Sequence, residues 1–359
     1  MTERGDGDSA AVEAGSHAAD DDGAVSLAIV VRRYLPGVVA LAGIAVAARV
    51  AGAAIPYATP LVTAVACGLF VGNLVSIPSS LSPGIDTHKL WLEAGIVLMG
   101  ARISIGTLLD SGGELIAVVV IGVTLAVVLA ETLGRVVFGV PRKLGSLLAA
   151  GAGVCGVSAV VGVAGSIAAD EEHVAYAAAT ILLFDVVTLF AYPPLGAALG
   201  LGDQVFGIWS GLTMFSTGPV TAAGFAFSET AGQWATVTKL TRNLLLGVLV
   251  GGYSLVYLNT GAGRRAFSPR VLWDSFPKFV LGFFALMVLS STAIVPPAAT
   301  AQLTDAYRWL FLVAFAGLGL HVDIEELRTT GVRPVAIVLT TLLVVSVVSL
   351  LVVEALFGV

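Results

Sequence analysis

Long apolar runs, separated by short polar or charged connections, dominate the chain. An apolar run of about 20 residues is long enough to cross a bilayer as a helix. Runs of this kind, bounded by charge, proline or glycine, predict eleven membrane spans. The expected spans are 35–54, 58–77, 89–108, 114–134, 144–166, 173–193, 204–227, 231–258, 276–296, 304–322 and 332–357. The pattern therefore predicts an all-α, polytopic membrane protein.

The amino-acid composition also indicates that most of the chain is embedded in a lipid bilayer. Of its 359 residues, 57% are hydrophobic and 12% are charged, with a mean hydropathy of +0.97. Soluble domains carry about 25% charged residues. Seven of the 24 acidic residues lie in the first 22 positions, so residues 1–24 are predicted to form a disordered acidic tail. Residues 25–359 are about neutral and are predicted to form a single integral membrane domain, which the motifs described below assign to transport. We therefore expect lipid and not nucleic acid as a partner.

The distribution of arginine and lysine predicts the orientation. Cytoplasmic connections of membrane proteins are enriched in both residues. With a cytoplasmic amino terminus, the outer connections hold mainly Arg49 and Arg308. The inner ones then hold Arg32, Arg33, Lys89, Arg135, Arg142, Lys143, Arg264, Arg265, Arg270, Lys278, Arg328 and Arg333. We expect a multi-pass protein of the cell membrane with its amino terminus inside and its carboxyl terminus outside.

Two stretches in the third and tenth expected spans resemble each other. "GARISIGTLLDSG" (100–112) and "GLHVDIEELRTTG" (319–331) share two glycines, one isoleucine and one leucine at matching positions. Spans seven apart have opposite orientations, which is the relation that an inverted repeat requires. The similarity predicts an inverted-repeat transporter.

The stretch "GAGVCGVSAVVGVAG" (151–165) places five glycines among fifteen residues inside an expected span. Glycine costs roughly 1 kcal/mol relative to alanine in a helix. One interpretation is close helix packing through small residues. The other is a helix interrupted near Gly151–Gly156, with Ser158 beginning a second half-helix. Transporters use such half-helices to point backbone amino ends at a substrate.

A second stretch, "MFSTGPVTAAG" (214–224), favours the interrupted helix. Thr217 and the following Gly-Pro form a helix start signal inside an apolar run. A simple proline kink is the structural alternative. Two glycines, one alanine and one serine of the two stretches also match at an offset of 62 residues. Two similar discontinuous helices, near 151–166 and 211–227, indicate a substrate site.

Polar residues gather on one face of a later span. In "KLTRN" (239–243), Lys239, Arg242 and Asn243 follow the spacing of a single helical face. An intramembrane cation costs at least about 2.5–3.5 kcal/mol and is a functional candidate by default. Lys239 is alternatively expected to extend toward the outer interface. The structural alternative for Arg242 is an ion pair with Asp185, Glu131 or Glu93.

Half-helix amino ends, hydroxyl groups and an arginine together describe an anion site, because backbone N–H groups, the helix dipole and a guanidinium all bind oxyanions. The candidate substrate-binding residues are Gly153, Cys155, Gly156, Ser158, Ser216, Thr217, Gly218, Thr221, Arg242 and Asn243. Asp185 and Lys239 are candidates for coupling or for an ion pair.

Other chemistries find little support. The two cysteines, Cys67 and Cys155, and four scattered histidines form no metal-ligand cluster, so we expect neither a metal site nor a cofactor. A nucleophilic Cys155 needs a nearby base, and no histidine lies in a mid-membrane position, so we do not expect an enzyme. No GxxxxGK[ST] motif occurs, so the sequence does not indicate a P-loop that binds ATP. Half-helices favour a transporter with alternating access over an open channel.

Seven stretches resemble the bacterial and archaeal membrane proteins known as the sulfate exporter family, over nearly everything after residue 30. They are "KLWLEAGIVLMGARIS" (89–104), "GAGVCGVSA" (151–159), "AAATILLFDVVTLFAYP" (177–193), "GPVTAAG" (218–224), "KLTRN" (239–243), "VLGFFAL" (280–286) and "FAGLGLHVDIEELRTTGVRP" (315–334). The resemblance implies an inverted-repeat transporter with crossed, broken helices, similar in outline to the bile-acid symporters. It also implies export of a sulfur compound.

The chain departs from the family pattern at two places. A His-acid pair expected before the "VVAAG"-like stretch is replaced by Phe215 and Ser216, whereas Asp185 stands where relatives have a neutral residue. The protein therefore either lacks the pair or has moved the acid to Asp185, and both possibilities put proton antiport in doubt. We predict a secondary active exporter of a small oxyanion, sulfate or a sulfonate. The alternative is a sodium- or proton-coupled carrier of a cation or organic anion, and H⁺ or Na⁺ is the expected coupling ion.

Overall fold

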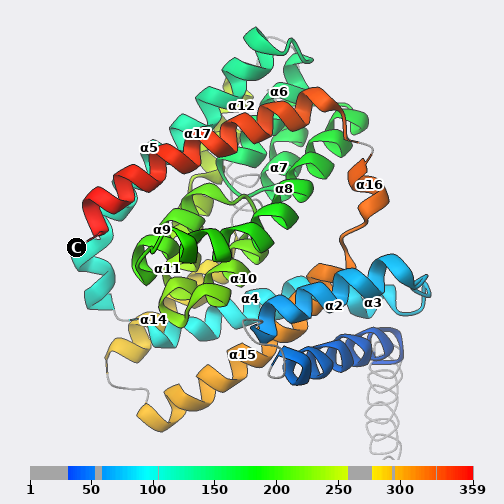
Figure 1. Ribbon diagram of the computed structural model, residues 1–359, viewed down its shortest axis with the longest axis vertical. Coiled ribbons are helices and arrows are strands. Elements are labelled where there is room, and N and C mark those ends of the chain that lie inside the picture. Colours follow the sequence, from blue (N-terminus) through cyan, green and yellow to red (C-terminus); the bar gives the residue numbers. More distant parts are fainter. Residues whose placement is uncertain are drawn as a thin grey trace, which may run out of the picture.

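The computed structural model describes residues 31–52, 59–103, 105–257, 277–292, 296–328 and 330–358, and every regular element in these ranges is a helix (Figure 1). The predicted acidic tail, 1–24, lies outside them. A helix at Val31–Gly52 comes first. The others are α2 (Pro60–Leu74), α3 (Ser82–Ile85), α4 (His88–Met99), the 3₁₀ turn η1 (Gly100–Arg102), α5 (Ile105–Thr132), the π-turn η2 (Leu133–Val137), α6 (Arg142–Gly153), α7 (Val157–Ile167), α8 (Glu171–Ala198), α9 (Asp203–Thr213), α10 (Thr217–Phe227), α11 (Glu229–Leu244), α12 (Leu246–Val256), α14 (Phe279–Ser291), α15 (Pro297–Leu320), α16 (Ile324–Arg328) and α17 (Val332–Phe357).

The helices form two groups that lie side by side (Figure 1). The panel group contains the first helix, α2, α3, α4, α14 and α15, with α15 packed against both α2 and α4. Gly68 of α2 and Gly319 of α15 allow this close approach, because a Cβ on Gly319 would lie 2.2 Å from the Val65 carbonyl oxygen. Small residues commonly let membrane helices approach in this way.

The core group contains α5 to α12 and α17. The pairs α11–α9, α10–α11 and α5–α6 pack most extensively, and α17 lies across α9, α5 and α8 (Figure 1). The two groups meet where α10 lies against α2 and α15.

Both expected discontinuous helices are present in the core group. The first breaks between α6 and α7, where Val154 leaves helical geometry and Gly156 has φ 65° and ψ −135°. The second breaks between α9 and α10, where Met214 and Ser216 are extended and α10 begins at Thr217. A further expected span, 231–258, bends between α11 and α12 at Leu245.

The predicted count of eleven spans is not confirmed. Five helices in the described ranges are long and apolar enough to cross a membrane: Val31–Gly52, Gly112–Val137, Glu171–Ala198, Ala298–Leu320 and Val332–Phe357. The count differs for two reasons. Some expected spans consist of two half-helices of 11 or 12 residues, such as α6–α7 and α9–α10, each too short to cross alone. Others contain one helix that is shorter than the apolar run, with 15 residues in α2, 12 in α4 and 13 in α14. The inverted repeat likewise stays a prediction, as does the orientation of the termini.

We expect Gly156→Ala to lower the unfolding temperature in detergent and Gly165→Ala to leave it unchanged or raised. A Cβ on Gly156 would lie 2.1 Å from Ser216 Oγ, on a backbone at φ 65°. Such strain costs about 1–3 kcal/mol for a residue with a side chain. A Cβ on Gly165 would meet nothing within 4 Å, so alanine there adds roughly 0.5–1 kcal/mol of helix stability. Equal unfolding temperatures for the two variants would contradict the tight crossing at Gly156.

Candidate functional site

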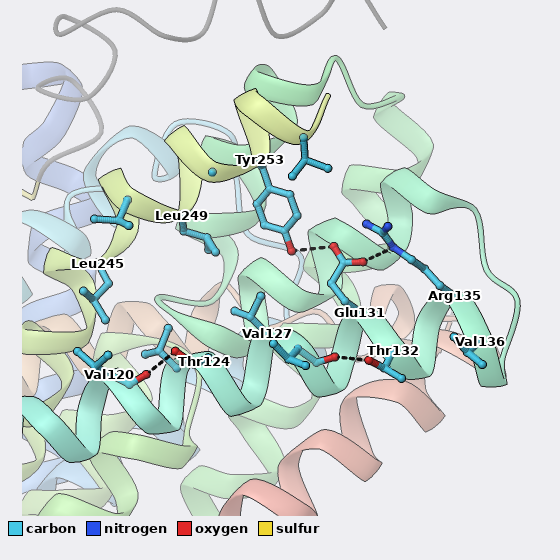
Figure 2. Close-up of a pocket in the computed structure, with 15 residues that line it drawn as sticks. Val120, Thr124, Val127, Glu131, Thr132, Arg135, Val136, Leu245, Leu249 and Tyr253 are labelled. Atoms are coloured by element: carbon cyan, nitrogen blue, oxygen red, sulfur yellow. Dashed lines mark hydrogen bonds and ion pairs between the residues drawn. The ribbon is translucent and has the colours of Figure 1, made fainter. Parts of the chain in front are cut away.

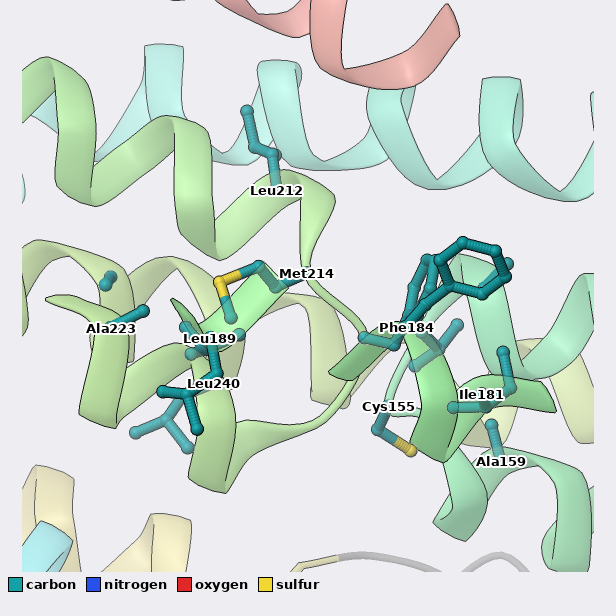
Figure 3. Packing of buried hydrophobic residues seen from close by; sticks show 14 of the residues in the cluster. Cys155, Ala159, Ile181, Phe184, Leu189, Leu212, Met214, Ala223 and Leu240 are labelled. Carbon is teal, nitrogen blue, oxygen red and sulfur yellow. The ribbon is translucent and has the colours of Figure 1, made fainter. Parts of the chain in front are cut away.

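The two broken helices cross at their non-helical stretches. Gly156 faces Ser216, and the absence of a side chain on Gly156 lets the two backbones touch. Figure 3 shows Cys155 and Met214 on these stretches, with Ile181, Phe184 and other apolar side chains packed around them. The crossing is therefore enclosed by apolar packing, and its polar atoms depend on protein partners.

Arg242 of α11 binds the carboxyl ends of both broken helices. Its NH1 donates to the carbonyl oxygens of Gly211 and Met214, both at 2.9 Å. Its NH2 donates to Ala152 at 3.0 Å and to Gly153 at 2.8 Å. Because the last carbonyls of a helix have no partner within it, the guanidinium closes α6 and α9 together.

Lys239 lies one turn earlier on α11 and completes this arrangement. Its Nζ donates to the carbonyl oxygens of Val154 at 2.6 Å and Met214 at 3.1 Å. Lys239 is 0% exposed, so its ammonium group stays inside the protein instead of extending to the interface. Positive charge at a helix carboxyl end is also favoured by the helix dipole.

The carboxylate at the crossing belongs to α8. Asp185 Oδ1 accepts a hydrogen bond from the backbone N–H of Ser216, the residue before α10, at 2.9 Å. Its second oxygen, Oδ2, is buried and has no hydrogen-bond partner in the described ranges. The negative charge therefore faces the amino end of α10, where the helix dipole favours it.

Arg242 makes no ion pair with the carboxylates that the sequence suggested. No salt bridge within 4.0 Å joins it to Asp185, Glu131 or Glu93, all three of which the structure describes. Glu131, near the end of α5, pairs instead with Arg135, four residues further on in the π-turn η2.

The remaining candidates lie at the amino ends of α7 and α10. Ser158, in the first turn of α7, is exposed, whereas Ser216 and Thr217 are half-buried. Asn243 Nδ2 donates to Thr217 Oγ1 at 3.1 Å, and Asn243 Oδ1 is buried without a partner in the described part of the chain. These side chains form a polar edge beside the crossing.

Four candidates are occupied by packing or by internal hydrogen bonds. A Cβ on Gly153 would lie 2.4 Å from Val127 Cγ2, and Cys155 belongs to the apolar cluster. The Thr221 hydroxyl donates to the Thr217 carbonyl oxygen and accepts from Thr236 Oγ1. Gly218 faces apolar side chains of the panel group.

Sequence reasoning missed the groups that surround these candidates. Lys239 and Arg242 of α11 bind backbone carbonyl groups, and no residue type in the sequence reveals which carbonyls these are. The panel residues near the site are Leu92 of α4 and Leu318 of α15, whose Cδ2 atoms each lie 3.5 Å from a Cβ position built on Gly218. One signal in the sequence was usable. Cations are favoured at the carboxyl ends of helices, and this preference would have predicted Lys239 and Arg242 beside the helix breaks.

The fold and the crossing define a polytopic helical membrane protein with paired discontinuous helices. The chain belongs to the UPF0324 membrane protein family, and it matches the family model described as conserved hypothetical protein 698 over residues 36–338. It is 34% identical to a UPF0324 membrane protein of Agrobacterium fabrum over 306 residues, covering 83% of this chain and 86% of the relative. A relative from Bartonella henselae is 32% identical, with 82% and 83% coverage. One from Clostridium tetani is 29% identical, with 90% and 97% coverage.

No solved structure matches the chain. The names of these three relatives give a membrane location and no substrate. The membrane family is therefore confirmed, and sulfate export stays a prediction.

We expect Arg242→Gln to destabilise the protein far more than Arg308→Gln. Glutamine cannot replace the four donated hydrogen bonds, and each buried carbonyl left unpaired costs about 1–3 kcal/mol. Arg308 pairs with Glu229 at a site where its side chain is 48% exposed, and such pairs contribute about 0–1 kcal/mol. Thermal unfolding in detergent measures both effects. If Arg242→Gln unfolded at the wild-type temperature, the guanidinium would be available to a substrate and its structural role would be wrong.

Proposed function

We propose that the protein is a secondary active transporter of a small anion, which binds beside the crossing of the two broken helices. The observation that carries the proposal is the charge balance there. Lys239 and Arg242 contribute two formal positive charges and Asp185 one negative charge, all with side chains at most 1% exposed. A net charge of +1 in a low-dielectric region favours a negatively charged ligand.

The amino ends of α7 and α10 are the proposed binding groups. The first N–H groups of a helix have no partner within it and carry the positive end of the dipole. Ser158 adds an exposed hydroxyl to α7, and Thr217 adds a half-buried one to α10. Arg242 acts here through its charge, because both terminal nitrogens already donate to backbone carbonyls.

Of the two substrates considered, a sulfonate is favoured over sulfate. Leu92 and Leu318 of the panel group are half-buried and face the first turn of α10 at Gly218. A short alkyl sulfonate presents an oxyanion to the helix ends and an apolar chain to these leucines. Sulfate is polar on all sides and would lose hydration against the leucines without compensation.

We expect an alkyl sulfonate to raise the unfolding temperature of the wild type more than sulfate does at equal ionic strength. A ligand at 100 times its dissociation constant adds about 2.7 kcal/mol of stability. Thr217→Val removes the hydroxyl at the α10 amino end and is expected to weaken this stabilisation. Thr241→Val is the matched control, because the Thr241 hydroxyl donates only to the Val237 carbonyl oxygen of its own helix. Stabilisation by neither anion, or equal loss in both variants, would contradict the anion site.

A coupling cation at the same crossing is the second candidate function. Asp185 Oδ2 and Asn243 Oδ1 are buried acceptors without partners in the described ranges. A carboxylate oxygen binds either a proton or Na⁺, an amide oxygen binds Na⁺, and transporters with broken helices couple to both ions. The two acceptors support a carrier in which H⁺ or Na⁺ binding accompanies anion movement.

We expect Asp185→Asn to abolish the dependence of uptake on a proton or sodium gradient in proteoliposomes. Asparagine retains an acceptor for the Ser216 N–H but removes the negative charge, so anion exchange without a gradient is expected to continue. Glu93→Gln is the matched control, because Glu93 is exposed on α4. Unchanged gradient dependence in Asp185→Asn would place the coupling group elsewhere.

A further inference from the structure

An apolar groove of about 700 Å³ lies between α5 and α12 (Figure 2). Val120 and Val128 of α5 line one wall, and Val248 and Leu249 of α12 line the other. The wall side chains are open to the surroundings, since Val128 is 58% exposed and Val248 is 73% exposed. From Val120 to Val136 the groove follows 17 residues of helix, whose 16 steps of 1.5 Å span about 24 Å.

One end of this groove is polar and charged. Glu131 Oε1 accepts hydrogen bonds from Ser146 Oγ at 2.6 Å and from Tyr253 Oη at 2.9 Å. Its other oxygen, Oε2, accepts from Arg135 Nε (Figure 2). The Glu131 carboxylate is therefore fully used inside the protein and has no need of a further cation.

Arg135 has N–H donors that do not bind Glu131. Its side chain is 37% exposed, its NH2 makes a single long contact of 3.5 Å to Ser146 Oγ, and NH1 has no hydrogen-bond partner among the described residues. The free edge of a guanidinium binds phosphate oxygens in a bidentate manner.

A second arginine adds positive charge at this end. Arg142 lies over the Tyr257 ring, with Cζ 4.8 Å from the ring centroid, and Tyr257 Oη is 3.0 Å from Ser146 Oγ. Arg135, Arg142 and Glu131 together give a formal charge of +1. The predicted orientation places this end at the cytoplasmic surface, where anionic lipids provide the complementary charge.

We infer that the groove is a binding site for an anionic phospholipid, with an acyl chain along the valine-lined walls and the phosphate on Arg135 and Arg142. The groove is long enough for an acyl chain, since one leaflet of the hydrocarbon core is about 15 Å thick, half of the bilayer's 30 Å. A peptide would leave its backbone groups unpaired against the valines. A small inorganic anion would leave the apolar walls unfilled. The inference is independent of the proposed transport function.

The test is native mass spectrometry of the full-length protein in detergent, titrated with phosphatidylglycerol and phosphatidylcholine of identical acyl chains. We expect a roughly tenfold preference for phosphatidylglycerol, which corresponds to about 1.4 kcal/mol. Arg135→Gln combined with Arg142→Gln is expected to remove the preference while phosphatidylcholine binding remains. Arg49→Gln is the matched control, because Arg49 stacks on Trp309 outside the groove.

Val248→Trp tests the apolar part separately. The side chain of Val248 is largely exposed, so tryptophan fills the groove without disturbing the core, and it is expected to reduce retention of both lipids. This variant keeps the inference testable if the double arginine variant does not fold. Equal binding of the two lipids by the wild type would overturn the inference. So would unchanged retention in Val248→Trp, or displacement of phosphatidylglycerol by inorganic phosphate at the lipid's own concentration.

Discussion

The bonds from Arg242 and Lys239 to the carboxyl ends of two broken helices are the interaction on which the core group depends. Interrupting a helix inside a membrane exposes carbonyl and N–H groups, and each unsatisfied group costs several kcal/mol in lipid. Four of the carbonyls at the breaks accept from Arg242 and two from Lys239, with Met214 shared by both. The cations offset the cost of the two breaks and explain why a polar helix such as α11 is buried.

Closing the carboxyl ends with protein cations makes the crossing electrically asymmetric. In broken-helix transporters, unwound carbonyls and helix carboxyl ends coordinate Na⁺ or H⁺. Here side chains already occupy those carbonyls, so a soluble cation has no role at them. Among the described residues, the charged side chain that is hydrogen-bonded at the amino end of α10 is Asp185, and the exposed Ser158 lies in the first turn of α7. This asymmetry is the physical reason for proposing an anionic substrate.

The sequence predicted the breaks but not what holds them. Glycine at 156 and the Thr-Gly-Pro start at 217–219 leave local signals, because helix interruption and helix initiation depend on residue type. The sequence does not indicate which backbone carbonyls lack a partner within their helix. Arg242 was therefore expected to bind either a carboxylate or a ligand. The ion pair between Glu131 and Arg135 could have been predicted from the sequence, because residues at i and i+4 are neighbours on a helix. The span count differed because a window of about 20 residues treats two half-helices as one span, and because α2, α4 and α14 are shorter than the apolar runs that contain them.

The shared partner also constrains how a transporter of this fold would move. Carbonyls from α6 and α9 bind the same guanidinium, and Gly156 contacts Ser216, so neither broken helix shifts without breaking buried hydrogen bonds. Movement within the crossing is therefore costly. The contact of α10 with α2 and α15 is apolar, as between Leu318 and Gly218. Hydrogen bonds join the two groups elsewhere, from Tyr307 and Arg308 of α15 to Glu229 of α11, at a partly exposed edge where water can replace them. Alternating access in this protein would then take place by movement of the panel group against an intact crossing.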